Sequence, residues 1–289
     1  MGSPFQYGGQ AVIEGVMMRG PETLAVAVRR PDQTIIIDEK TVGSLTKRVP
    51  VLKWPLVRGV VVLIEALVLG IKALTFSAGQ ATGEEEELTA KEIIITVGVA
   101  LALAVLLFAV LPTAAAHLLN RIAPGTLIQN LLEGVFRIAI FLAYVLAIGR
   151  MGDIQRVFQY HGAEHKVINA FEAGDRLVVE RVQQYSTLHP RCGTSFLLIV
   201  MVISILIFSL LGEQVLWWRI LSRVLLLPVV AGISYELVKL SGKHSTVPLC
   251  RVLIAPGLWL QKLTTGPPDD GQVEVALAAF DAVSKESEK

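Results

Sequence analysis

Long apolar segments separated by shorter polar connections dominate the pattern of this 289-residue chain. Four of these segments are apolar over most of their length: residues 93–111, 131–148, 194–211 and 215–237. Each is close to the ~20 residues that an α-helix needs to cross the hydrocarbon core of a bilayer. The pattern therefore predicts a mostly α-helical integral membrane protein, with four transmembrane helices that form two hairpins over residues 93–148 and 194–237.

A fifth helical pattern covers residues 56–76. Arg58, Glu65 and Lys72 recur there every seven residues, which places a narrow polar stripe on an otherwise apolar helix. We predict an amphipathic helix that lies in the membrane interface or packs against the bundle. The alternative is a full transmembrane helix that tolerates one polar face.

Residues 1–55 have a different pattern, with short β-like runs between glycines and prolines. Two such runs flank Pro31, Asp32 and Gln33, which indicates a hairpin in a small β-containing N-terminal element. The first residues lack the basic and apolar regions of a secretory signal, so we expect the N-terminus to stay in the cytoplasm.

Composition and charge support a membrane location and suggest an orientation. The chain is 53% hydrophobic and only 18% charged, which is too little polar surface for a water-soluble globule of this size. Of the 26 Lys and Arg residues, 22 lie in residues 1–92, 149–193 and 238–289. The positive-inside rule therefore places both termini and the loop of residues 149–193 in the cytoplasm, provided that residues 56–76 do not cross. A net charge of +1 gives no field for gathering nucleic acid, so we expect no nucleic-acid partner.

The first candidate for chemistry lies in YHGAEHKVINAFEAGD, residues 160–175. If this segment is helical and stops at Gly174, His161 and His165 lie one turn apart on one face. Two imidazoles so placed can bind one tetrahedral ion, and Glu164 beside them is a candidate general base. The order His-x-x-Glu-His is that of the inverted zinc-protease motif. The alternative is a pair of ordinary hydrogen-bonded histidines.

A second cluster, His189 and Cys192, comes directly before the segment of residues 194–211. With His161 and His165 it would complete a four-ligand site, which is typical of a structural metal. An open site would instead take a third ligand from Glu236 or Glu172 and leave a position for water. Cys192 could equally be a small buried hydrophobic residue.

Charged residues also occur inside the apolar segments. Glu133 and Arg137 are one helical turn apart and can pair, and Arg219 and Arg223 follow Trp217 and Trp218 at the start of the last segment. We interpret the four charged residues as a structural ion-pair set. A role in transport is the weaker alternative.

Several blocks in the chain resemble those of the YqhQ-like bacterial membrane family: GGQAVIEGVMMRGP, KWPLVRGVV, YHGAEHKVINAFEAG, STLHPRCGTSF, SYELVK and the final APGLWLQKLTTGPPDDGQVEVALAAF. That family has no settled reaction and is described as a predicted metal-dependent enzyme. The resemblance implies a metal at the positions of His161, Glu164, His165, His189 and Cys192.

These features together predict a protein of the bacterial plasma membrane with a cytoplasm-facing site for a divalent metal, zinc by its ligand types. Hydrolysis is the reaction class that the ligands and the base of residues 161–165 favour. The alternative is a non-catalytic scaffold or regulatory protein with a structural metal site or none. The sequence indicates a lipid environment but neither a substrate nor whether the chain forms a homo-oligomer.

Overall fold

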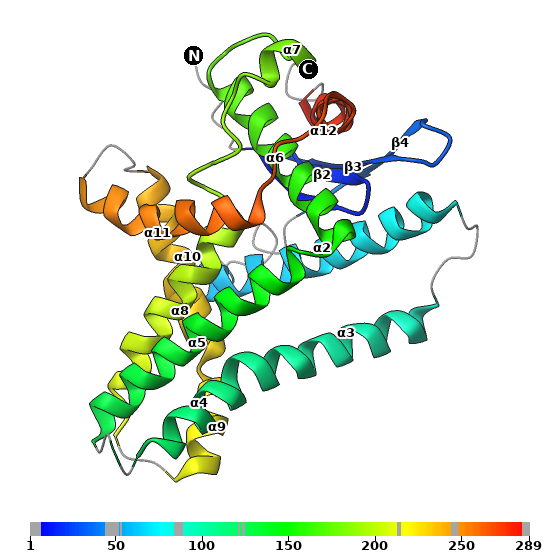
Figure 1. The fold of residues 1–289 in the computed structure, drawn as a ribbon. Helices are drawn as coiled ribbons and strands as arrows, with labels where there is room; N and C mark the ends of the chain where they lie inside the picture. Colours follow the sequence, from blue (N-terminus) through cyan, green and yellow to red (C-terminus); the bar gives the residue numbers. More distant parts are fainter. Residues whose placement is uncertain are drawn as a thin grey trace.

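A computed structural model of the chain describes residues 7–43, 54–83, 89–120, 125–212, 215–243 and 248–284, together with Leu52 and Ile122. The described part is mostly helical and carries one small antiparallel sheet near the N-terminus. The sheet and several helices form one end of the molecule, from which a bundle of long apolar helices extends (Figure 1).

The sheet has four antiparallel strands in the order β1-β2-β3-β4. Their bounds are Gly8–Val12 for β1, Gly15–Arg19 for β2, Thr23–Arg29 for β3 and Ile35–Thr41 for β4. The hairpin predicted around Pro31 is confirmed as the β3–β4 turn, where Asp32 Oδ1 accepts hydrogen bonds from the backbone N–H and the hydroxyl of Thr34 at 3.0 and 2.6 Å. The short polar turn and the apolar strands together define this element.

The two central strands β2 and β3 are buried on both faces, which explains why they are apolar almost throughout. One face packs against α6 (Gly152–Glu172) and α12 (Asp270–Ser284), and the other packs against α2 (Val57–Thr82). The small helix α7 (Val179–Val182) joins the first of these layers. The N-terminal strands, expected as a separate element, thus share a core with segments that follow much later in the chain.

The helical bundle is built from elements in the middle of the chain. They are α3 (Ala90–Val105), the π-helix η2 (Leu106–Val110), α4 (Leu111–Leu118), α5 (Thr126–Ile148), α8 (Gly193–Ser209), α9 (Leu216–Leu225), α10 (Leu227–Lys243) and α11 (Pro248–Thr264). Helices α4 and α9 lie at the end of the bundle far from the sheet (Figure 1).

Among the described residues, three helical stretches are long and apolar enough to cross a membrane: Val57–Thr82, Lys91–Leu118 and Thr126–Ile148. A fourth is possible if α9 and α10, which meet at an angle of 44°, form one broken span. The set differs in part from the four predicted segments. Helix α2 qualifies, although the pattern favoured an interfacial helix, while α8 is a shorter apolar helix of 17 residues. The predicted segment of residues 215–237 is bent rather than continuous.

The predicted end of the first apolar segment at Pro112 is wrong, because the helix continues to Leu118. Proline lacks a backbone N–H and clashes with the carbonyl group four residues earlier, here that of Phe108. The chain accommodates Pro112 by widening into a π-helix over Leu106–Val110, directly before it. The carbonyl oxygen of Phe108 is left to accept a hydrogen bond from Arg137 Nε at 2.8 Å.

Candidate metal centre

Helix α6 carries the two histidines, as the sequence predicted. Asp153 in its first turn favours the positive end of the helix dipole, and Gly174 ends it with a φ of 71° that glycine adopts without strain. The spacing of four residues brings the imidazole rings of His161 and His165 to one face, with centroids 4.4 Å apart. The prediction of a helix with both rings on one side is confirmed.

Each histidine is oriented by a backbone carbonyl group. Nδ1 of His161 lies 2.8 Å from the carbonyl oxygen of Thr264, and Nδ1 of His165 lies 2.6 Å from that of Thr187. A carbonyl oxygen only accepts, so both Nδ1 atoms must carry the proton, which leaves both Nε2 atoms as acceptors. This is how proteins commonly orient histidines that bind a metal.

The thiol of Cys192 completes the cluster. Its Sγ lies 3.1 Å from Nε2 of His161, and the ligand atoms of His161, His165 and Cys192 all lie within 4.8 Å of one another. Cys192 is the N-cap residue of α8, where its Sγ also contacts the hydroxyl and the backbone N–H of Thr194 at 3.0 and 3.4 Å. The N-cap position and these contacts fix the direction of the sulfur toward His161.

The loop before α8 is fastened to α6 by two side chains that follow the histidines. Lys166 Nζ donates to the carbonyl groups of Gln183 and Tyr185 at 2.6 and 2.7 Å. Asn169 Nδ2 donates to the carbonyl groups of Ser186 and Leu188 at 2.8 and 3.1 Å. These bonds hold the intervening carbonyl group, that of Thr187, against His165.

Close backbone packing fixes the carbonyl group that orients His161. The segment after α11 lies directly on α6, where Gly266 donates its N–H to the carbonyl group of Phe158 at 2.8 Å. A Cβ atom at Gly162 would overlap the carbonyl oxygen of Gly266. Glycine at position 162 therefore allows the approach that brings Thr264 to the imidazole ring.

Glu164, the predicted general base, is buried on another side of α6. Its carboxyl group lies next to Gly9 of β1, where a Cβ atom in place of the glycine hydrogen would be 3.1 Å from Glu164 Cδ. Burial raises the pKa of Glu164 to about 7, and this rise is partly offset by the nearby His161 and a hydrogen bond from the Gly9 backbone. Glu164 does not belong to the group of converging ligand atoms.

The other predicted ligands lie outside that group. The imidazole of His189 is 5.7 Å from that of His165 between centroids, and its Nε2 is 3.5 Å from a carboxylate oxygen of Glu172. Glu172 also pairs with Arg191. Glu236 is far along the chain and accepts hydrogen bonds from Arg58, one of them at 2.6 Å. Of the six predicted ligands, the structure brings together His161, His165 and Cys192.

The three converging residues fit a zinc-type ion by the chemistry of their donors, and the pair of His161 and Cys192 fits nearly by distance. Tetrahedral zinc bonds of ~2.0–2.1 Å to nitrogen and ~2.3 Å to sulfur place the two ligand atoms about 3.5 Å apart. The observed 3.1 Å between His161 Nε2 and Cys192 Sγ therefore needs an opening of only about 0.4 Å. Burial lowers the pKa of His165, which favours the neutral imidazole that a metal requires.

Sequence reasoning missed the groups that hold these ligands in place. The carbonyl groups of Thr187 and Thr264 carry no signal in residue type, since every residue has one. Gln261 could have been noticed as a lone amide in an apolar helix. It is fully buried and exchanges hydrogen bonds with the backbone N–H and carbonyl of His189, both at 2.8 Å, and it donates to Ser195 Oγ.

Comparison with known proteins shows the family of this chain. A family model described as "Protein of unknown function (DUF1385)" matches residues 54–286. The "Uncharacterized protein YqhQ" of Bacillus subtilis (strain 168) is 38% identical over 306 aligned residues, which cover 99% of this chain and 96% of that protein. No solved structure matches. The chain is therefore a member of the DUF1385 family, to which the resemblance in its sequence blocks pointed.

Proposed function

We propose that this protein is a multi-pass protein of the bacterial plasma membrane that binds one zinc-type metal ion on its cytoplasmic side. One observation carries the metal site: two imidazoles, each with its Nδ1 bonded to a backbone carbonyl, converge with one thiol, and the ligand atoms of the three residues lie within 4.8 Å of one another. Histidines that only stabilise a helix need no shared third partner. The donor set of two nitrogens and one sulfur suits zinc.

The membrane part of the proposal is supported by the apolar helices and their surfaces. Large apolar side chains such as Ile94 and Leu210 are 71% and 85% exposed, which water would disfavour and lipid would not. The basic residues of the sequence gather in residues 1–92, 149–193 and 238–289. With α2 packed against the sheet rather than crossing the membrane, the positive-inside rule favours a cytoplasmic position for both termini and for the candidate metal centre.

A site with three protein ligands leaves one position of a tetrahedral ion for water, which is the arrangement of catalytic zinc. Bound zinc would lower the pKa of such a water towards neutrality. Hydrolysis is the reaction class that this site supports best, with Glu164 as a base that reaches the site through an intervening water.

A structural metal is the second candidate, and the burial of the ligands favours it. His165 is 1% and Cys192 is 7% exposed, and an ion between them would join α6 to the start of α8. In this role the fourth ligand would be His189, after a movement that brings its buried Nε2 to the ion. Removal of any one ligand would then destabilise the whole fold.

Metal analysis of the purified full-length protein tests the site. We expect about one zinc per chain in the wild type and none in the double variant His161→Ala with His165→Ala. Replacement by cobalt would give a thiolate-to-metal absorption that Cys192→Ser loses and Glu164→Gln keeps. An equal metal content in wild type and double variant would refute the site.

The same cobalt-loaded protein separates the two candidate functions. A small anion such as azide should change the visible spectrum if one coordination position holds water. In a closed structural site the spectrum should be unchanged, and His189→Ala should lower the metal content as strongly as His161→Ala.

The membrane orientation is tested by labelling two cysteine variants, Glu180→Cys and Gly212→Cys, with an impermeant thiol reagent in intact cells. Only the cysteine at position 212 should react, because position 180 lies on the proposed cytoplasmic side.

A further inference from the structure

Four charged side chains are buried at the end of the bundle far from the sheet. Glu133 and Arg137 lie on α5, Arg219 and Arg223 lie on α9, and their side chains are 2%, 8%, 11% and 2% exposed. The cluster contains three guanidinium groups and one carboxylate, so two positive charges lack a counter-charge within the described part of the chain. Glu213, a nearby acidic residue in the sequence, lies outside the described residues.

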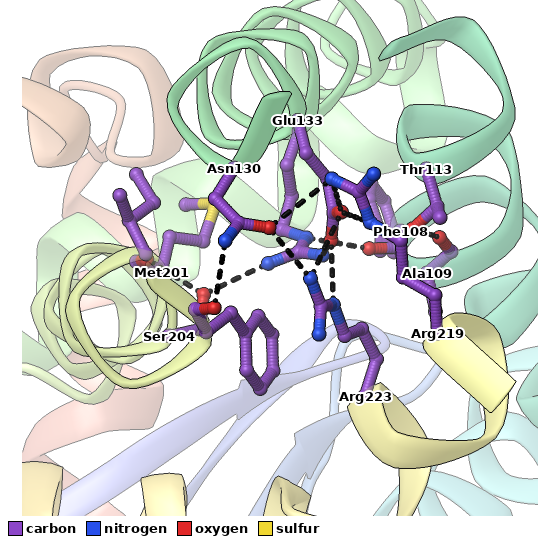
Figure 2. Close-up of polar contacts among 12 residues, drawn as sticks. Phe108, Ala109, Thr113, Asn130, Glu133, Met201, Ser204, Arg219 and Arg223 are labelled. Carbon is purple, nitrogen blue, oxygen red and sulfur yellow. Dashed lines mark hydrogen bonds and ion pairs between the residues drawn. The ribbon is translucent and has the colours of Figure 1, made fainter. Parts of the chain in front are cut away.

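The three guanidinium groups converge on Glu133, and Figure 2 shows Arg219 and Arg223 next to Glu133 and Asn130. Glu133 Oε1 accepts from Arg137 Nη2 at 2.7 Å and from Arg223 Nε at 3.1 Å, and Oε2 accepts from Arg219 Nε at 3.1 Å. Asn130 Oδ1 accepts from Arg219 and Arg223 at 3.1 and 2.9 Å. One carboxylate and one amide oxygen are therefore shared among three positive charges.

Contacts with groups other than Glu133 and Asn130 fix the positions of Arg137 and Arg223. Arg137 donates to the Phe108 carbonyl group that Pro112 leaves without its helical partner, and to Ser204 Oγ at 2.9 Å. The guanidinium of Arg223 lies over the ring of Phe208, 4.5 Å from its centroid. Arg219 is the most exposed of the three, and its Nη1 has no hydrogen-bond partner among the residues that the structure describes.

We propose that this arginine cluster binds the phosphate group of an anionic phospholipid. Guanidinium groups match phosphate oxygens in geometry and charge, and an anion would supply the counter-charge that is lacking. Trp217 and Trp218 on α9 are 66% and 41% exposed, and tryptophan is typical of the headgroup level of a bilayer. A phospholipid brings its phosphate to that level together with acyl chains for the apolar surface around it.

The proposal assumes the membrane placement given above but not the metal site. It is tested on the purified full-length protein in a neutral detergent by thermal unfolding with three probes: phosphatidylglycerol, phosphatidylcholine and inorganic phosphate. Phosphatidylglycerol should raise the unfolding midpoint in a saturable way, and the other two should not. Arg219→Gln should weaken the apparent affinity about tenfold or more, since one charge-assisted contact is lost.

Two further variants separate lipid binding from a purely structural ion network. Arg150→Gln removes an exposed positive charge at the other end of α5 and should leave the lipid effect unchanged. Glu133→Gln should unfold at a lower temperature than the wild type and gain a larger shift from phosphatidylglycerol, because a competing carboxylate is gone. In a purely structural network this variant would gain nothing from lipid.

Three outcomes would overturn the proposal. One is an equal shift with phosphatidylcholine, which would show a general effect of lipid. Another is an unchanged lipid affinity in Arg219→Gln. An equal shift with inorganic phosphate would overturn the assignment to a lipid. A protein that stays dispersed without any detergent would instead refute the membrane placement, so the two failures are distinguishable.

Discussion

The candidate metal centre and the arginine cluster lie at opposite ends of the helical bundle. Their buried polar groups are stabilised in different ways. At the end near the sheet, the donors are imidazoles and a thiol, groups that can be neutral when no ion is bound. Each imidazole there has its own backbone carbonyl partner. At the far end the groups are permanently charged arginines, and their partners include a carboxylate, an amide oxygen, a serine hydroxyl and the freed carbonyl oxygen of Phe108.

This difference determines what each cluster can bind. Neutral donors with fixed directions are stable when empty and gain a bond each when a cation arrives, so the site near the sheet suits a metal. The arginine cluster carries excess positive charge in an apolar setting, so it is stabilised by an anion. The first should therefore tolerate loss of a ligand residue better than the second tolerates loss of its carboxylate.

The largest effect expected is that of Glu133→Gln in the absence of anionic lipid. The change leaves three buried guanidinium groups without a charged acceptor, which should lower the free energy of unfolding by about 3–5 kcal/mol. Chemical denaturation in neutral detergent measures this. Glu274→Gln breaks the exposed ion pair with Arg29 and serves as the control, with an expected cost below about 1 kcal/mol. Equal costs would contradict the idea that the far cluster depends on its one carboxylate.

A pair of glycine substitutions compares the backbone constraints of the two regions. Gly162→Ala places a Cβ on the carbonyl oxygen of Gly266, so the segment after α11 must move, at a cost of about 3 kcal/mol. The shift also displaces the Thr264 carbonyl that orients His161, so zinc affinity should fall at least about tenfold. Zinc titration with a competing chelator measures this loss.

Gly134→Ala is the matched variant in α5. Its Cβ would lie 2.4 Å from Cγ1 of Ile205, so this β-branched side chain must shift, at a cost of about 1–3 kcal/mol. Zinc affinity should not change, because the strain is remote from the Thr264 carbonyl. A zinc affinity that falls equally in both variants would show that the site responds to general loosening rather than to the Thr264 contact.

The sequence predicts the parts of this structure that depend on local patterns, such as turn residues between β-like runs, helical spacing or oppositely charged residues one turn apart. Short β-like runs on either side of Pro31 predicted the β3–β4 hairpin, and the spacing of His161 and His165 predicted a shared helix face. The pairing of Glu133 with Arg137 one turn later was equally visible and is confirmed at 2.7 Å. In each case the partners are close in sequence, so local geometry suffices.

The remainder depends on contacts between distant segments. Nothing local shows that α12 would cover the sheet, or that Glu236 would pair with Arg58 rather than join the histidines. The continuation of the helix through Pro112 depends on Arg137, which occupies the freed carbonyl of Phe108 from a neighbouring helix. The pattern of apolar residues around Pro112 cannot reveal this hydrogen bond, because its donor lies on another helix.

Replacing one asparagine next to each cluster should have small effects on stability, and each effect should be confined to one cluster. Asn130 is 4% exposed, and its side chain accepts from two arginines and donates to the Phe208 carbonyl, so Asn130→Ala should cost about 2 kcal/mol. Asn169 is half-buried and donates only to neutral carbonyl groups, so Asn169→Ala should cost about 1 kcal/mol.

The two asparagine variants should also differ in which ligand they affect, zinc or phosphatidylglycerol. Asn169→Ala loosens the loop whose Thr187 carbonyl orients His165, so it should weaken zinc binding severalfold and leave the response to phosphatidylglycerol intact. Asn130→Ala removes an acceptor that competes with phosphate for Arg219 and Arg223, so it should leave zinc binding intact and alter only the lipid response. Parallel zinc and lipid titrations of both variants measure the four effects. Loss of zinc affinity in Asn130→Ala would mean that the two ends of the bundle are coupled, whereas separate responses follow if each cluster is organised by its own neighbours.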